Sequence, residues 1–376
     1  MPKRVLHLLL AATFLAAPCA AQTRAAPVFD PAATAAGPRP VPGPVYESYA
    51  FSRAVARGTR TRTGMPGPNY WVQHPRYSID VALDPARHRV TGRETVVYAN
   101  HSPDTLGTIA VYLRQNVFAP GVPRRQPAPT TGGVTLGRVT VNGRTIAAEP
   151  RDNPAMPITA PPEAPPHVGQ YVVDGTVMHI PLERPLAPGD SAVLTFAWSY
   201  EPPPSPADGR EGRDGRVYFM GYWYPEVAVY DDVDGWVTDP YLLEAEFYMD
   251  PADYDVRITV PRGWVVDGTG TLANAGAVLT AAARDSLAAA HRTGRVVRVL
   301  TPGAGAARVF TRGGATATWH FVAPNVRDFA WGTSDQYAWD ATRALVSGGR
   351  DTVAINSFFR LTTAAAAWRL GGARFT

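Results

Sequence analysis

The sequence predicts a mainly β fold, organised as a large antiparallel β-sandwich or saddle-like domain with one short peripheral helix. In residues 77–84, apolar side chains alternate with small or polar ones, which is the pattern of a strand with one buried face. Turn signals such as Asn142-Gly143 recur between such segments, about every dozen residues. Only residues 279–291 have helical character. Short strands joined by frequent turns are typical of two packed antiparallel sheets.

The first two predicted strands form a hairpin. Residues 77–84 lead into the turn sequence Asp84-Pro85-Ala86-Arg87, and residues 88–100 return as the second strand. The same patterns predict further strands at residues 108–113, 134–146 (with the Asn142-Gly143 turn), 171–180, 191–200, 245–249, 255–260, 264–270, 296–300, 317–322, 329–332 and 353–359.

The helix and the longest loops have their own signals. Thr280 is a suitable N-cap for the helix at residues 279–291, and Thr293-Gly294 is a suitable exit. Its few apolar anchors predict a peripheral position. Residues 120–131 and 150–167 are rich in proline, which cannot donate to a strand ladder, so both are predicted surface loops.

The N-terminus resembles a secretory signal peptide at residues 1–21. Lys3 and Arg4 are followed by an apolar stretch too short to span a bilayer and by the small residues Cys19-Ala20-Ala21. We therefore expect a secreted or periplasmic protein. Lipid attachment at Cys19 is the alternative, and Pro18 disfavours it. No later segment has the length of a membrane span, so no integral membrane segment is expected after signal removal.

Charge and cysteine content exclude several partners and chemistries. The net charge is only +4, and the arginines are dispersed, so a nucleic-acid partner is not expected. Cys19 is the single cysteine and lies in the signal segment, so the exported chain would have no disulfide and no thiolate metal ligand.

Composition divides the rest of the chain into three regions. Residues 22–68 are rich in Ala, Pro and Gly and are predicted to form a flexible tether. Residues 69–335 contain nearly all the predicted strands and form the expected β-domain. Residues 336–376 are expected to open a further domain, and residues 361–376 have no recognisable ending.

Aromatic and acidic side chains are densest in residues 218–248. Acids resist burial unless they are paired, so this segment predicts either an ordered loop with satisfied polar groups or the wall of a binding site. Glu244 and Glu246 lie two apart on a predicted strand and would face the same side. Together they could bind a cationic amine, whereas solvated strand acids are the plainer interpretation.

Four kinds of catalytic or metal site have sequence signals that this chain can be compared with. No histidine pair has the spacing of a zinc helix, and no Gly-x-Ser-x-Gly elbow occurs. Asp231, Asp232 and Asp234 before Gly235 resemble part of a calcium loop, but the distal glutamate is missing, so an aspartate-capped turn is favoured. A glycosidase could use two acids of this segment, and the available ones are Asp232, Glu226, Glu244 and Glu246.

Several sequence blocks, taken in order, resemble the N-terminal part of the M1 family of zinc metallopeptidases, and in particular a bacterial exported branch. The resemblance covers about residues 70 to 345. The blocks are Tyr70-Trp71, residues 77–85, residues 90–95, residues 100–106, Trp223-Tyr224-Pro225, residues 228–232, Gly235-Trp236, residues 238–241, Glu246-Phe247-Tyr248, residues 254–256, residues 258–261, residues 263–266 and residues 325–330.

This resemblance implies an aminopeptidase that acts on peptide N-termini, with a β-rich N-terminal domain followed by a zinc-containing catalytic domain. In the family a His-Glu-x-x-His helix activates a zinc-bound water, and an acid of the N-terminal domain helps hold the substrate amine. This sequence has no such helix. We therefore expect the non-catalytic portion, with a truncated or frameshifted start of the catalytic domain at residues 336–376, no catalytic or metal residues of its own, and no activity alone.

Zinc and the missing catalytic domain are thus expected only in the intact enzyme. Glu244 and Glu246 lie in roughly the right region to be the amine-binding acid. The alternative is a stand-alone extracellular module that binds peptides or carbohydrates with the surface of residues 222–248.

Overall fold

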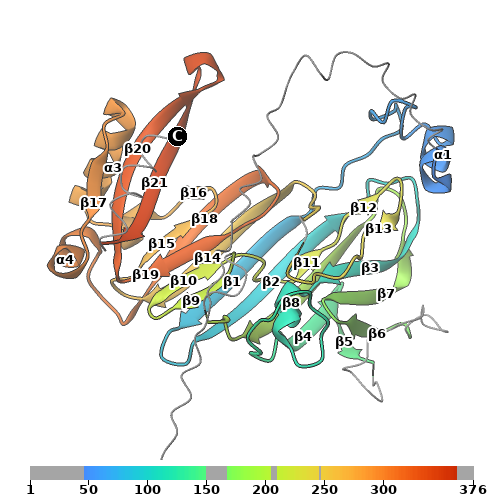
Figure 1. Ribbon diagram of the computed structural model, residues 1–376, viewed down its shortest axis with the longest axis horizontal. Helices are drawn as coiled ribbons and strands as arrows, with labels where there is room; N and C mark the ends of the chain where they lie inside the picture. The colour runs from blue at the N-terminus through green and yellow to red at the C-terminus, as the bar shows by residue number, and fades with distance from the viewer. Residues whose placement is uncertain (1–45, 150–166, 205–209, 245–246, 362–376) are drawn as a thin grey trace, which may run out of the picture. The chain divides into compact units, whose positions relative to one another are not determined.

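The computed structural model describes residues 46–149, 167–204, 210–244 and 247–361 (Figure 1). Residues 48–376 form one unit of the chain, and every helix and strand below belongs to it. The predicted signal peptide with Cys19 lies outside the described residues, as does most of the second proline-rich loop. Within the described ranges, none of the helices has the length and apolar character that a membrane crossing requires.

Twelve strands of the described part form the principal sheet, in the spatial order β11-β3-β7-β6-β5-β4-β8-β2-β1-β14-β18-β16. Neighbours are antiparallel except β1 with β14 and β5 with β6. This sheet confirms the predicted mainly β, largely antiparallel fold. Its strands are β1 (Arg76–Asp84), β2 (Arg89–Ala99), β3 (Leu106–Tyr112), β4 (Thr135–Val141), β5 (Arg144–Ala148), β6 (Gln170–Asp174), β7 (Val177–Leu186), β8 (Ser191–Tyr200), β11 (Glu226–Val227), β14 (Ala252–Pro261), β16 (Thr271–Leu272) and β18 (Thr316–Val326).

The predicted first hairpin is confirmed as β1 and β2. Every second residue of β1 is buried, as the alternation requires, and Asp84 pairs with Arg89 at the turn. The Asp84 carboxylate accepts hydrogen bonds from the backbone N–H groups of Ala86 and Arg87, at 2.9 and 3.1 Å. These bonds close the turn, and His88 follows with a positive φ of 48°.

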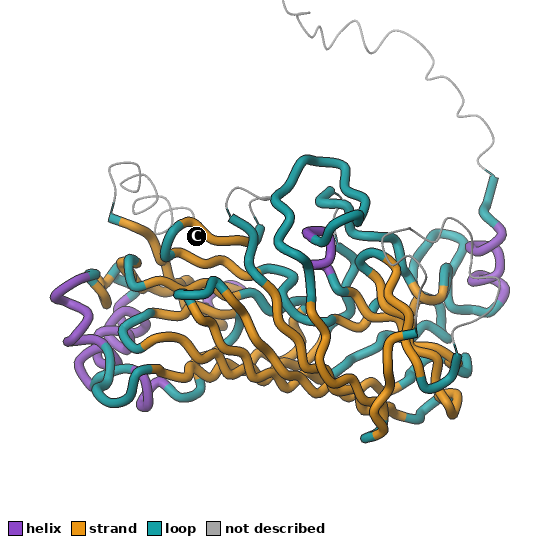
Figure 2. Tube along the Cα trace, turned by 90° about the horizontal axis from the view of Figure 1, so that it is seen from below, coloured by secondary structure: helices purple, strands orange, loops and turns teal. Residues whose placement is uncertain are grey.

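The principal sheet has two unlike faces. We call the face that bears Tyr77, Glu94 and Tyr254 the inner face, and the opposite face the outer face. Figure 2 shows the long loops gathered on one side of the band of strands. The segment that includes Trp223 and Tyr224 packs on the inner face, because the Tyr224 ring lies 5.6 Å from that of Tyr77 and 5.9 Å from that of Tyr254.

Three smaller sheets complete the strand structure of the described residues. The four-stranded sheet contains β15 (Val265–Gly268), β19 (Trp331–Ser334), β10 (Val217–Met220) and β9 (Gly212–Asp214). The three-stranded sheet contains β17 (Val297–Leu300), β20 (Tyr337–Val346) and β21 (Asp351–Arg360), and the two-stranded sheet contains β12 (Tyr230–Asp231) and β13 (Gly235–Trp236). Since β17 pairs with β20, residues on the two sides of the expected boundary at residue 335 share one sheet.

The described chain contains four α-helices rather than the single one predicted. They are α1 (Tyr49–Ala56), α2 (Ala275–Val278), α3 (Ala281–Thr293) and α4 (Ala306–Val309), with 3-10 turns at η1 (Arg114–Phe118), η2 (Gly303–Gly305) and η3 (Ser347–Gly349). The predicted helix is α3, and its N-cap and exit are confirmed. The Thr280 hydroxyl accepts a hydrogen bond from the Ala283 N–H, and Gly294 has a left-handed φ of 66°.

Two sequence expectations need correction. Helix α1 lies inside the expected tether, where the Ser48 hydroxyl caps it by accepting from the Phe51 N–H at 3.1 Å. Order therefore begins about 20 residues earlier than expected, at Tyr49 rather than at residue 69, because an eight-residue helix shows little periodicity. The strand predicted at residues 245–249 is wrong for its described part, since Phe247, Tyr248 and Met249 are in a loop.

Candidate functional site

The aromatic and acidic segment at residues 218–248 is a packed covering of the inner face. Trp223 is fully buried, and its indole N–H donates to the Phe329 carbonyl at 2.8 Å. The Trp198 indole N–H in turn donates to the Trp223 carbonyl at 3.1 Å. The Tyr224 and Tyr254 hydroxyls are 2.8 Å apart, and the Tyr77 hydroxyl accepts from the Val227 N–H. The rings thus satisfy their polar atoms inside the core, as buried Trp and Tyr require.

The acidic loop of this segment is the aspartate-capped turn favoured by the sequence. The Asp231 carboxylate accepts from the backbone N–H groups of Val233 and Asp234 at 3.0 and 2.7 Å. Asp232 is buried and receives a two-pronged contact from the Arg60 guanidinium, with N–O distances of 2.8 to 3.0 Å. Their carboxylates are therefore used within the fold. Among the described residues, no three His, Cys, Asp or Glu side chains come together as metal ligands, and the calcium alternative has no support.

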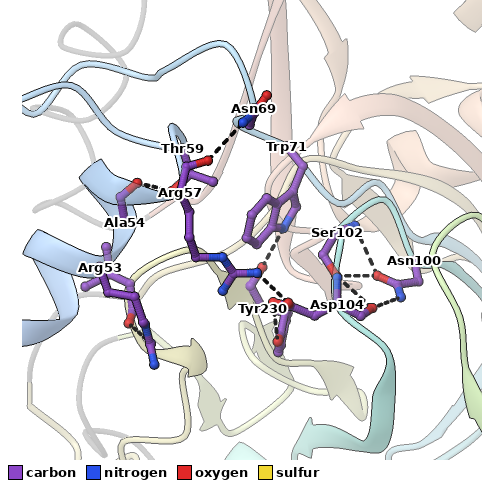
Figure 3. A network of polar contacts seen from close by, with 11 residues as sticks. Arg53, Ala54, Arg57, Thr59, Asn69, Trp71, Asn100, Ser102, Asp104 and Tyr230 are labelled. Atoms are coloured by element: carbon purple, nitrogen blue, oxygen red, sulfur yellow. Dashed lines mark hydrogen bonds and ion pairs between the residues drawn. The ribbon is translucent and has the colours of Figure 1, made fainter.

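A strap of chain at residues 48–71 holds this loop in place (Figure 3). Arg57 forms an ion pair with Asp104, and the Tyr230 hydroxyl donates to the other oxygen of the same carboxylate at 3.0 Å. The Trp71 indole N–H donates to the Tyr230 carbonyl at 3.2 Å, and Arg53 donates to the Val233 carbonyl at 3.1 Å. The strap is thus bonded to the β12–β13 turn at several points.

The central polar group beneath the covering is a buried ion pair between Arg114 and Glu226. Arg114 lies in η1 and Glu226 in β11, and both side chains are at least nine-tenths buried. The guanidinium carbon lies 4.5 Å from the Tyr112 ring centre, 5.6 Å from that of Tyr222 and 4.9 Å from that of Phe247. Burial raises the pKa of Glu226 to about 7 although the Arg114 charge opposes the rise. A carboxyl group with a pKa near 7 is found both in functional sites and in buried ion pairs.

Three further acids lie near this pair. Burial raises the pKa of Asp328, with Arg114 opposing, and one oxygen of its carboxyl has no partner among the described residues. Burial and the Asp231 charge raise the pKa of Asp250 to about 7. Glu94 is fully buried, and burial together with the Glu226 charge raises its pKa well above the usual value. Within the described ranges, neither oxygen of the Glu94 carboxyl has a hydrogen-bond partner.

The structure does not place Glu244 among these buried acids. Its side chain is exposed in a loop, 3.6 Å from the Arg125 guanidinium and 3.3 Å from the Gln126 amide. Glu246 lies outside the described residues. The argument that the two acids share one side of a strand therefore does not hold, because Glu244 is not in a strand.

Sequence reasoning missed three acids near this ion pair, namely Glu94, which is buried, and Asp250 and Asp328, which are half-buried. Glu94 had a detectable signal, because it occupies an inward position in the alternation of β2, between Gly92 and Val96. Asp328 and Asp250 had none, since their burial depends on segments that come together only in the folded chain. The sequence suggests Glu226 only as a glycosidase acid.

The arrangement of these acids gives little support to the glycosidase alternative. Hydrogen bonds from Arg60 and Thr59 outweigh the effect of burial and keep the pKa of Asp232 below its usual value. A general acid needs a raised pKa, so Asp232 is unsuited to that role. Glu226 has a raised pKa, but its carboxylate is bound by Arg114.

Comparison with known proteins gives structural neighbours only. No protein-family model matches the chain, and neither does any curated protein sequence. Among solved structures, an M1 zinc metallopeptidase from Deinococcus radiodurans is similar with a TM-score of 0.43 and 13% identity, over 79% of this chain and 50% of that one. A mutant of an M1 zinc metallopeptidase from the same organism, bound to a Tyr-Ser-Ala substrate, has a TM-score of 0.40 and 14% identity over the same shares. The chain spans about half the length of these structures.

Proposed function

We propose that this chain is the β-rich N-terminal portion of an exported, zinc-dependent aminopeptidase of the M1 type and is not catalytic by itself. The proposal rests on one observation: the sequence blocks that resemble the M1 family lie together in the folded chain. Trp223-Tyr224-Pro225, the strand that begins Tyr254-Asp255-Val256 and the block with Asp328-Phe329 come from distant parts of the chain. Their rings and hydrogen bonds join them in one core. Blocks that were matched in order along the sequence therefore form one structural unit.

In the intact enzyme this portion would supply an acidic wall beside the active-site cleft. A carboxylate binds an ammonium group by charge-assisted hydrogen bonds. Glu244 is one of the exposed acids of the segment, and we propose that it and Glu246 contact the amine of a peptide N-terminus. The ion pair of Glu226 with Arg114 would then stabilise the aromatic segment that covers the inner face. Such a wall orients the substrate amine and excludes water.

We assign none of the described residues as a zinc ligand. The described side chains offer no group of three metal ligands, so they do not fit the metal that the family implies. No chemical step is therefore derived through zinc. The ligands would belong to the catalytic domain of the intact enzyme.

The proposal is tested with the purified chain. Elemental analysis is expected to find zinc far below one equivalent, and aminoacyl-arylamide substrates are expected to remain uncleaved. Zinc-dependent turnover that persists in highly purified material, and that chelation removes, would overturn the non-catalytic role. The nucleotide sequence beyond codon 376, read in all frames, tests the parentage, because a zinc-helix motif encoded there is the expected finding.

A stand-alone binding module is the second candidate, and one observation favours it. Tyr248 is 44% exposed at the end of the aromatic segment, where its ring is available to a ligand. Isothermal titration separates the two functions. Saturable binding of free-amine peptides or neutral oligosaccharides that a Tyr248→Ala variant loses would support the module. Peptide binding that N-acetylation abolishes and Glu244→Gln weakens would support the acidic wall.

A further inference from the structure

A separate hollow lies on the outer face of the principal sheet, on the side opposite Glu94 and Glu226. It has a volume of about 530 Å³ and crosses β14, β1, β2, β8 and β4. Ligand sites have volumes of about 300–1,000 Å³. We call this hollow the outer trough, and its wall includes Ala82, Arg89, Thr91, Arg93, Thr135 and Ser199.

The floor of the outer trough is a row of small, mostly hydroxyl-bearing side chains. Strand register places Thr259 beside Ala82, Ala82 beside Thr91, Thr91 beside Ser199 and Ser199 beside Thr135. Because these residues are direct cross-strand neighbours, the row runs across five strands, a span of roughly 19 Å at ~4.8 Å per strand. Exposed sheet faces usually carry longer side chains, so the small ones leave the hollow.

Two arginines of β2 stand on either side of this row. Arg89 and Arg93 each lie two residues from Thr91 and therefore project from the same face, with Cα atoms roughly 13 Å apart. Arg89 donates to the Ser199 hydroxyl, which orients it across the trough. Arg93 makes no ion pair or side-chain hydrogen bond with the described residues. Asp80 is its cross-strand neighbour and brings the opposing charge of the trough wall.

We propose that the outer trough binds an acidic oligosaccharide, lying along the hydroxyl row with its carboxylate or sulfate groups on Arg89 and Arg93. Threonine and serine hydroxyls both donate and accept, which matches the hydroxyls of a sugar. Guanidinium groups bind carboxylate or sulfate through paired, charge-assisted hydrogen bonds. The hydroxyl row crosses five strands, so it fits an extended chain. This site is independent of the aminopeptidase proposal and of the inner-face acids.

Isothermal titration at low salt tests the site with defined sugars. A heparin-derived hexasaccharide supplies sulfates, an oligogalacturonide of equal length supplies carboxylates, and maltohexaose is the neutral control. We expect saturable binding of at least one acidic sugar, one per chain, and none of maltohexaose. Arg93→Ala is expected to weaken binding by about tenfold or more, as the loss of a charge-assisted contact does. Ala82→Leu, which fills the hollow without a charge change, should weaken binding by a similar factor.

Arg138→Ala is the matched control, because Arg138 is an exposed arginine of β4 outside the outer trough. It should change the dissociation constant by less than about twofold. An equal loss in Arg138→Ala and Arg93→Ala would overturn the proposal in favour of unspecific charge attraction. So would the absence of saturable binding up to about 1 mM sugar, or tighter binding of inorganic polyphosphate than of either acidic sugar. Circular dichroism confirms the fold of each variant. Arg93→Ala removes a charge, whereas Ala82→Leu fills the hollow, so the two variants test the site in different ways.

Discussion

Burial sets the protonation of the carboxyl groups beneath the aromatic covering. The pKa values of Glu226 and Asp250 rise to about 7, and that of Glu94 rises well above its usual value, with desolvation as the largest cause each time. A carboxyl with a raised pKa binds its proton more tightly in the folded than in the unfolded state. Its contribution to stability is therefore fully present in acid and is lost as the pH rises through about 7.

Asp250→Asn tests this sign at one residue. The neutral amide mimics the protonated carboxyl, so the variant should be more stable than the parent by roughly 2–4 kcal/mol at pH 8. The gain should shrink toward pH 4, where the parent carboxyl is protonated. Urea unfolding at several pH values measures it. Asp80→Asn, on the exposed outer face, is the control and should stay within about 0.5 kcal/mol. A variant no more stable than the parent at pH 8 contradicts the argument.

Arg114→Met should be among the most damaging single changes. It leaves the Glu226 charge buried without its partner, which costs about 3–5 kcal/mol near pH 8. The loss should be smaller at pH 5, where Glu226 is protonated, and Glu226→Gln should restore part of it in the same chain. Arg144→Met is the control, because its ion pair with Glu183 is more than 60% exposed and solvent screening leaves it little effect on stability. Equal losses in the two variants, measured by urea unfolding, would refute the buried-pair argument.

At the scale of elements, the sequence predicted the strands well and the site poorly. Alternation identified β1, β2, β8 and β14 because each has one buried face. The parallel pairing of β1 with β14 could not be predicted, since it joins segments nearly 170 residues apart without a local signal. The prediction for Glu244 depends on a strand position, but Glu244 lies in a loop. The acids near Arg114 are covered by segments that come together only in the folded chain.

Close approach between β2 and β8 gives an element-scale prediction. A side-chain carbon added at Gly92 would lie 2.3 Å from the Trp198 ring, which is too short for any real contact. Gly92→Ala should therefore destabilise the fold by about 1–3 kcal/mol through overpacking. Gly107→Ala on β3 is the matched control, because nothing lies within 4 Å of the added carbon. If the two variants have the same urea midpoint, the packing of the inner face is not as described.

At the scale of the whole molecule, the strap at residues 48–71 is part of the folded β-domain, although it precedes the first strand. Composition alone placed the start of order near Tyr70, yet Arg57 and Arg60 reach across to Asp104 and Asp232. Asp232 is almost fully buried, so its charge depends on the Arg60 contact. The stable unit therefore begins at α1, and its stability depends on ion pairs between its first 25 or so residues and loops 47 and 172 residues away along the chain.

Two shortened chains test whether the folded domain begins at Ser48 or at Tyr70. A chain that begins at Ser48 keeps every strap contact and should unfold within about 0.5 kcal/mol of the full chain. A chain that begins at Tyr70 leaves Asp232 buried without Arg60 and should lose roughly 3 kcal/mol or more. Asp232→Asn in the shorter chain should recover part of that loss, because it removes the unpaired charge, whereas the same change in the full chain should destabilise. Urea unfolding measures the full chain and these four variants, and equal midpoints for the Ser48 and Tyr70 starts would mean that the strap contributes nothing to the domain.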